Sequence, residues 1–222
     1  DFTLNYYGTD ENILSTALAT EKEKAGTLLT KAKLPADAQR LSQAIATASS
    51  ATGYSAMNDA LAQLKQAMQN VQNSNSIWNT YHNQTLPVAQ SLLNTELDEP
   101  ASKQALQKLL DRQKQMLSGE NAATQTLYTC NMILSASLEY FRRHEQAEGY
   151  ANDGRYNEEA RGQLNQLLEN QEETILQLTD PVAFTNLVRA LNLEIEKVRL
   201  TQQPGENTDY TFAIRSAGTG DN

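Results

Sequence analysis

The residue types that most often hold metals or perform acid–base chemistry are scarce in this chain. It has one cysteine, Cys130, and two histidines, His82 and His144. A di-iron helical protein needs Glu-x-x-His motifs, but the residues three places before the histidines are Asn79 and Phe141. One cysteine and two widely separated histidines also lack the ligand spacing of a zinc site. The sequence therefore predicts no metal ligands.

Motifs for phosphate, calcium and hydrolytic chemistry are also missing. The chain has no glycine-rich loop of the Walker or dinucleotide-binding type. The stretch NDGRYNEE (152–159) lacks the alternating ligands of a calcium-binding loop, so a solvated turn is expected there. The adjacent carboxylates Glu172 and Glu173 are the residues on which an enzymatic alternative would depend, and only if they converged in a polar pocket. We predict a non-enzymatic protein without catalytic residues or a cofactor.

Two potentially reactive side chains have simpler structural explanations. Cys130 lies in LYTCNMILSASLEYF (127–141), among apolar residues at helical spacing, which favours a buried structural thiol. His144 follows Arg142-Arg143 near the expected end of a helix, where a cationic ring would complement the helix dipole. Neither residue is therefore predicted to act in catalysis.

Four aromatic residues, Trp78, Tyr81, Tyr150 and Tyr156, are the candidates for an interaction surface. Trp78 and Tyr81 are three residues apart and so share one face of a helix. Packing in a core or at a junction is the expected use of such a pair. If the two rings were exposed, they would instead form an adhesive or sugar-stacking patch.

Length, composition and charge restrict the possible partners. The chain has 222 residues, a formal net charge of −9, 39% hydrophobic residues and 6% aromatic residues. Nucleic acid is excluded as a partner because such binding requires clustered lysine and arginine. No apolar run approaches the roughly 20 residues that span a bilayer. The chain begins at Asp1 rather than methionine, which is typical of a protein whose signal peptide has been removed.

One sequence pattern occurs three times: a leucine-rich stretch, a short break that ends in proline, and a second amphipathic stretch. When the copies are aligned on Pro35, Pro100 and Pro181, aliphatic residues recur six and ten places later. The copies are LLTKAKLPADAQRLSQAI (28–45), LLNTELDEPASKQALQKLL (92–110) and ILQLTDPVAFTNLVRAL (175–191). Repeated helix–Pro–helix units predict an all-α fold, built as elongated three-helix-bundle units or as a helical array.

Breaks in the helical pattern predict the domain boundaries. We expect an N-terminal arm (1–9), a first helical unit (10–74), a second unit (75–148), a linker (149–157), a third, partial unit (158–203) and a tail (204–222). Ala51-Thr52-Gly53 is expected to form a turn, and the third helix is expected to run on through 74–86, with Pro87 as a kink or a new start. In the tail, Tyr210, Phe212 and Ile214 alternate with less apolar residues, a pattern typical of a strand. The tail is either a flexible end or the opening strand of a further β domain, and the alternation favours the second.

The first unit resembles the FIVAR-type helical repeats of bacterial cell-surface proteins. The resemblance covers KLPADAQRLSQAIATASSATGYSAMNDALAQLKQAMQNVQN (33–73), with ALAQLKQAM (60–68) as the nearest match. Residues 100–145 and 181–203 share only the helix–Pro–helix framework. The tail is similar to the start of a β-sandwich module of secreted gut-bacterial proteins. These resemblances imply an extracellular or cell-surface location in a bacterium and neighbouring domains in the same polypeptide.

Together, these observations favour a non-enzymatic structural or adhesion module that acts as a spacer or as a scaffold for a protein or a glycan. The alternative is a helical domain that binds a ligand or a peptide in a groove between units. An exposed apolar or aromatic groove at 76–93 would favour that alternative.

Overall fold

The computed structural model describes residues 10–202, and every regular element in that range is helical. The elements are α1 (Glu11–Leu29), α2 (Pro35–Ser50), α3 (Tyr54–Thr80), the π-helical turn η1 (Tyr81–Thr85), α4 (Leu86–Ser91), the π-helical turn η2 (Leu92–Glu96), α5 (Pro100–Ser118), α6 (Thr124–Asn152), α7 (Glu158–Gln177) and α8 (Val182–Arg199). The all-α prediction is confirmed for this range. The arm at 1–9 and the strand predicted in the tail lie outside the described residues.

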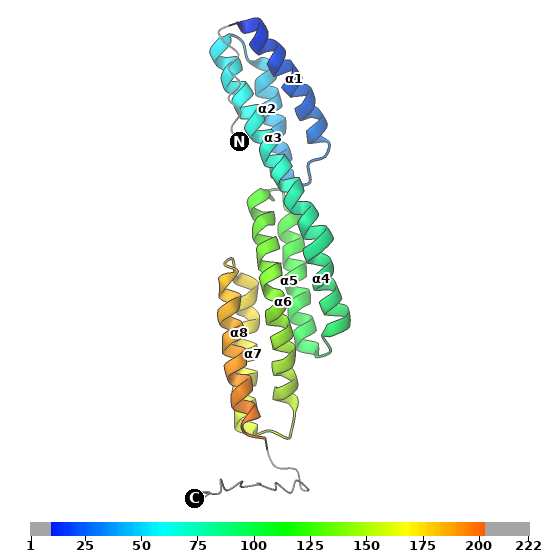
Figure 1. Cartoon of the computed structure of the whole chain (residues 1–222), viewed down its shortest axis with the longest axis vertical. Coiled ribbons are helices and arrows are strands. Elements are labelled where there is room, and N and C mark those ends of the chain that lie inside the picture. The colour runs from blue at the N-terminus through cyan, green and yellow to red at the C-terminus, as the bar shows by residue number, and fades with distance from the viewer. Residues whose placement is uncertain (1–9, 203–222) are drawn as a thin grey trace, which may run out of the picture.

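Helices α1, α2 and α3 pack against one another at one end of an elongated molecule (Figure 1). We refer to them as the first helical group. Their core is aliphatic, with Leu14, Leu41 and Leu64 fully buried. The Asp10 side chain accepts a hydrogen bond from the Asn12 N–H and so caps α1. Gly53 has a φ of 78°, a left-handed conformation that favours glycine at this turn.

The third helix continues without interruption from the first helical group into the rest of the molecule (Figure 1). In the π-helical turn η1, the Leu86 N–H bonds to the Tyr81 carbonyl five residues earlier. The wider turn ends two residues before Pro87, whose ring would clash with a carbonyl four residues back in a regular α-helix. A second widened turn closes the segment, where the Leu97 N–H bonds to the Leu92 carbonyl. Pro87 therefore lies inside a continuous helix.

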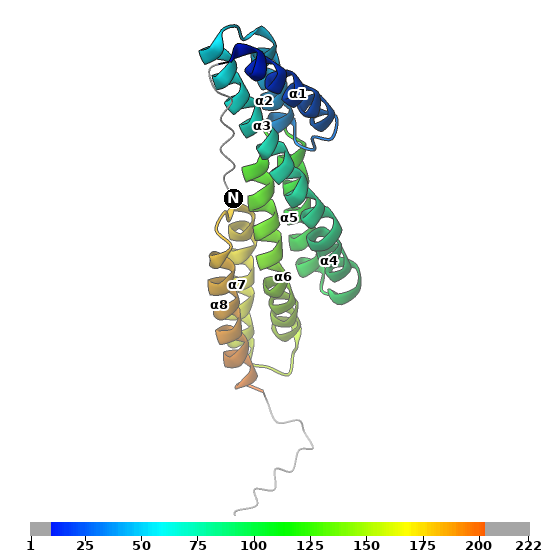
Figure 2. The ribbon, with the colours of Figure 1, turned by 45° about the horizontal axis from the view of Figure 1, so that its top comes forward.

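The remaining elements, η1 to α8, form a second helical group around α6. Figures 1 and 2 show α7 and α8 on the side of α6 that faces away from α4. Both helices contribute to the same core as α5 and α6, with Leu134, Phe141, Leu164 and Phe184 among the buried side chains. Residues 158–203 were predicted to form a separate, partial unit. In the structure, α7 and α8 instead belong to the second helical group, because two helices alone cannot bury their apolar faces and these two pack on α6. Likewise α6 extends to Asn152, so the connection is shorter than the predicted linker 149–157.

Polar contacts and one apolar side chain join the two helical groups beside the continuous helix. The buried Asp37 carboxylate on α2 accepts hydrogen bonds from the Thr124 N–H at 2.9 Å and the Thr124 hydroxyl at 2.8 Å. The residue before α6 is Ala123, which has no capping side chain, so Asp37 caps α6 from another helix. The Ala36 N–H donates to the Ala122 carbonyl at 3.1 Å, and Leu34 packs into the core of the second group. We call this set of contacts the joint.

Within residues 10–202, no helix combines the length and the apolar character that crossing a membrane requires.

Candidate functional site

A groove of about 660 Å³ lies in the second helical group. One wall is the continuous helix from the end of α3 through η2, and the other wall is α5. It is lined by Trp78, Tyr81, His82, Leu86, Gln90, Leu93 and Asn94 on the first wall and by Gln107, Leu110, Asp111, Lys114, Leu117 and Ser118 on the second. A cavity of this size is within the range of ligand sites in proteins.

The groove arises because both walls pack on α6, and α5 contacts η2 at one end. Its floor is fixed by a buried chain of hydrogen bonds across three helices. The Tyr81 hydroxyl donates to Gln113 Oε1 at 2.9 Å, and Gln113 Nε2 donates to the Cys130 carbonyl at 3.1 Å. All three residues are at most 3% exposed. Burial raises the pKa of Tyr81 and raises the pKa of the Cys130 thiol to about 11.

An aromatic stack forms the first wall of the groove at its start. The rings of Trp78 and His82 lie 3.9 Å apart between centroids with an interplanar angle of 18°. His82 Nδ1 lies 3.2 Å from the Trp78 carbonyl oxygen, and Tyr81 meets the His82 ring edge-on. Trp78 is half-buried, so part of the indole faces the groove. π-helical turns often occur at functional sites, and η1 begins at Tyr81.

The four predicted aromatic residues form two separate pairs. Trp78 lines the wall of the groove and Tyr81 its buried floor. Tyr150 and Tyr156 are half-buried and pack edge-to-face with ring centroids 5.3 Å apart, at the junction of α6 and α7. Tyr150 lies 20 residues beyond Cys130 on α6, which is roughly 30 Å along the helix axis. The second pair therefore lies far from the groove.

Sequence reasoning identified the wall at 76–93 but missed the α5 wall, which includes Leu110 and Lys114. The amphipathic pattern of α5 contained the only available signal. Leu110 continues the apolar face of α5, and it is half-buried and lines the groove.

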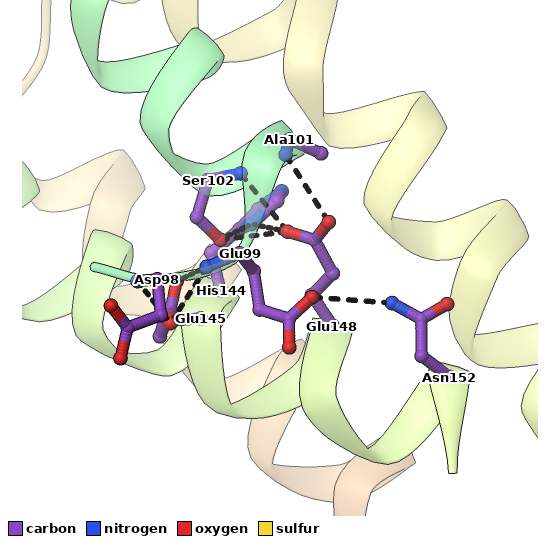
Figure 3. A network of polar contacts seen from close by, with 8 residues as sticks. All are labelled: Asp98, Glu99, Ala101, Ser102, His144, Glu145, Glu148 and Asn152. Atoms are coloured by element: carbon purple, nitrogen blue, oxygen red, sulfur yellow. Dashed lines mark hydrogen bonds and ion pairs between the residues drawn. The ribbon is translucent and has the colours of Figure 1, made fainter.

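His144 was predicted to be a cation near a helix end, and that prediction is wrong. The ring is 2% exposed, eight residues before the end of α6, and its Nδ1 lies 2.7 Å from the Ser102 hydroxyl (Figure 3). Burial lowers the pKa of His144, against the opposing effects of Glu148, Glu172 and Glu145. The neutral ring is therefore favoured in the folded protein, and its role is to pack and to hydrogen-bond inside the core.

Two carboxylates from α6 cap the start of α5 beside His144 (Figure 3). Glu145 accepts hydrogen bonds from the backbone N–H groups of Asp98 and Glu99, at 2.7 and 3.0 Å. The Glu148 carboxylate accepts from the N–H groups of Ala101 and Ser102, at 3.2 and 3.0 Å. It also accepts from the Ser102 hydroxyl at 3.0 Å. Because α5 has no capping side chain of its own, these carboxylates satisfy its free donors and complement the helix dipole.

The Ser102, His144 and Glu148 side chains are the residue types of a hydrolytic triad, but their arrangement is structural. The Ser102 hydroxyl already contacts both partners, and the residue is 0% exposed, so no substrate can reach it. Glu172 forms an ion pair with Lys108 of α5. Among the described residues, no group of three or more histidine, cysteine, aspartate or glutamate side chains could hold a metal ion.

Comparisons with family models, with curated proteins and with solved structures find no match to this chain.

Proposed function

We propose that the chain is a non-enzymatic structural module of a bacterial surface or secreted protein, built from tandem helical units, which acts as a spacer and an interaction scaffold. The observation that carries the proposal is the continuous helix from Tyr54 to Glu96, which belongs to both helical groups. At 1.5 Å per residue this helix is roughly 65 Å long.

A spacer must resist bending between its units, and the joint supplies that resistance. Bending at residues 74–86 would break backbone hydrogen bonds of the continuous helix. It would also separate Asp37 from Thr124 and withdraw Leu34 from the core of the second helical group. Because the helix, the hydrogen bonds and the apolar contact act together, we expect the two groups to move as one body.

Small-angle X-ray scattering of the full chain at several concentrations tests the spacer function. A compact chain of this length has a radius of gyration of roughly 17 Å. We expect a clearly larger value, an elongated distance distribution, and no change with concentration. A near-spherical particle with a radius of gyration close to the compact value would overturn the proposal.

A second candidate function is the binding of a ligand or a peptide. The groove favours it, because an aromatic and aliphatic hollow lies at 76–93 and continues onto α5. Grooves between helices that combine apolar floors with polar rims are common sites for amphipathic helices. In this second function the packing of both walls on α6 serves to hold them at a fixed separation.

A further inference from the structure

The groove lies in the least acidic part of an acidic protein. The chain contains 27 aspartate and glutamate residues and has a net charge of −9, yet none of these acids lies between Asp59 and Glu96. This interval contains the entire first wall of the groove, from Trp78 to Asn94. Its polar side chains there are His82, Gln90 and Asn94, so the wall carries no negative charge.

The second wall carries an excess of positive charge. Helix α5 contains four basic residues and one acid, but Lys108 pairs with Glu172 of α7. The charged side chains that line the groove and its continuation are Lys103, Lys114 and Asp111, so two positive charges and one negative charge give a formal net charge of +1. Lys114 lies on the groove itself, and Lys103 lines a shallower hollow that continues it past Leu93 to Pro100. The Asp111 carboxylate accepts a hydrogen bond from Gln107 Nε2 at 3.0 Å. Asp111 therefore offsets Lys114 within the groove, and Lys103 leaves an excess of one positive charge towards the other end.

The apolar positions of the two walls match the spacing of a helical ligand. Trp78, Leu86 and Leu93 line the first wall, while Leu110 and Leu117 line the second. From Trp78 to Leu93 the wall extends roughly 22 Å, which is the length of an α-helix of about 15 residues. Polar side chains such as Gln90 and Gln107 lie at the exposed rim. The groove is thus long, apolar at its base and polar at its edges.

We propose that this groove binds an amphipathic α-helix of a partner protein, with its apolar stripe against the groove floor and acidic side chains directed at Lys103 and Lys114. The proposal rests on the groove-binding function proposed above and names its partner class. Charge complementarity decides the sign of the partner's polar face, since a basic helix would meet Lys103 and Lys114 with Asp111 as the single acid of the lining. The length of the groove favours a helix over a small ligand.

Three designed peptides of about 16 residues test this inference. In the first peptide, leucine occupies positions i, i+3, i+4 and i+7 of every two helical turns, and glutamate occupies the other positions. The second peptide has lysine in place of glutamate. The third has the composition of the first in a scrambled order. Binding to the full chain is measured by fluorescence anisotropy of labelled peptide and by the emission of Trp78, the only tryptophan. We expect the acidic peptide to bind at least about tenfold more tightly than the basic one and to shift the Trp78 emission.

Two charge-reversal variants locate the binding site. Lys114→Glu changes the groove wall, and we expect it to weaken binding of the acidic peptide by about fivefold or more. Lys33→Glu is the matched control, because it makes the same charge change at an exposed position between α1 and α2 and should leave the affinity unchanged. Both positions are exposed, so both variants are expected to fold, which circular dichroism checks. Raising the salt concentration should reduce the affinity for the acidic peptide.

The possible failures are distinguishable. Equal affinity for the acidic and basic peptides would overturn the acidic partner while leaving a groove that binds helices. Absence of binding by all three peptides would overturn the inference and the binding of a peptide in the groove. Sedimentation that shows self-association abolished by Lys114→Glu, but not by Lys33→Glu, would identify a second copy of the chain as the occupant and would also overturn the inference.

Discussion

Replacement of Asp37 by alanine is the most informative perturbation of the joint. The Asp37 carboxylate is 2% exposed and accepts two hydrogen bonds from Thr124, at 2.9 and 2.8 Å. It is the only side chain that caps α6 in the structure described here, because Ala123 precedes that helix. Alanine removes both hydrogen bonds and leaves the Thr124 N–H without its partner.

The expected loss of stability follows from the burial of these groups. Loss of a capping side chain costs about 0.5–2 kcal/mol, and the half-buried position of Thr124 places this cap towards the upper end of that range. One term opposes this loss: Asp37 Oδ1 is buried without a hydrogen bond, and Arg40 lies 3.8 Å away and is largely exposed. Removal of the carboxylate therefore recovers part of its desolvation cost. The net expectation is a decrease of about 2 kcal/mol in the free energy of unfolding.

Urea denaturation followed by circular dichroism measures this change, and the exposed Asp59→Ala on α3 provides the control. The control should change the free energy of unfolding by less than about 0.5 kcal/mol. A double-mutant cycle with Thr124→Ala should give a coupling energy of about 1 kcal/mol or more. If Asp37→Ala costs no more than the control, or if its effect is additive with Thr124→Ala, the joint does not hold the two helical groups together as argued.

Three further predictions concern single positions. Burial lowers the pKa of His144 below its ordinary 6.5, so as the pH falls the unfolded chain binds the proton before the folded chain does. The free energy of unfolding relative to His144→Gln should therefore be highest above about pH 6.5 and should fall by at most about 1.4 kcal/mol per pH unit below it. Urea titrations at several pH values measure this difference. An unchanged difference between pH 7 and pH 5 would contradict the neutral buried ring. Gly26→Ala in α1 should stabilise the protein by about 0.5–1 kcal/mol, because the added methyl group meets open space. Gly53→Ala should destabilise the protein, because Gly53 has a positive φ. Thermal melts compare the two variants, and equal shifts of the melting temperature would refute this reasoning. Finally, burial raises the pKa of the Cys130 thiol to about 11, so this thiol should react with Ellman's reagent only after the protein unfolds. Rapid labelling of the native protein at pH 8 would contradict this and would show that the groove floor opens.

Local sequence signals predicted the helices and several of their ends. Asp10 and Gly53 occur where a capping oxygen and a left-handed residue are needed, and Pro35 and Pro100 begin α2 and α5, where a missing N–H costs nothing. The apolar stripe beyond residue 74 also indicated a helix that runs on through 74–86, but whether Pro87 kinks that helix or begins a new one was left open. The two π-helical turns were not predicted, because a widened turn keeps the same residue types as an ordinary helix.

Contacts between distant residues were beyond such reasoning. The Glu148 carboxylate accepts a hydrogen bond from the Ser102 hydroxyl, and the two residues are 46 positions apart in the sequence. Asp37 and Thr124, which are also hydrogen-bonded, are 87 positions apart. Periodicity gives the buried face of a helix but not the helix that covers it. For this reason α5 was not recognised as a groove wall, and His144 was assigned to a helix end when it lies against Ser102 in the core.

A distance measurement across the joint tests the rigid-spacer claim most directly. Ser55 on α3 and Thr95 in η2 are exposed and lie at the two ends of the continuous helix, and the buried Cys130 should leave cysteines at these positions as the reactive pair. Double electron–electron resonance between spin labels at Ser55→Cys and Thr95→Cys should give one narrow distribution centred near roughly 60 Å, from 1.5 Å per residue. A broad distribution, or one centred at a much shorter distance, would show that the chain bends between its helical groups and would contradict the spacer function.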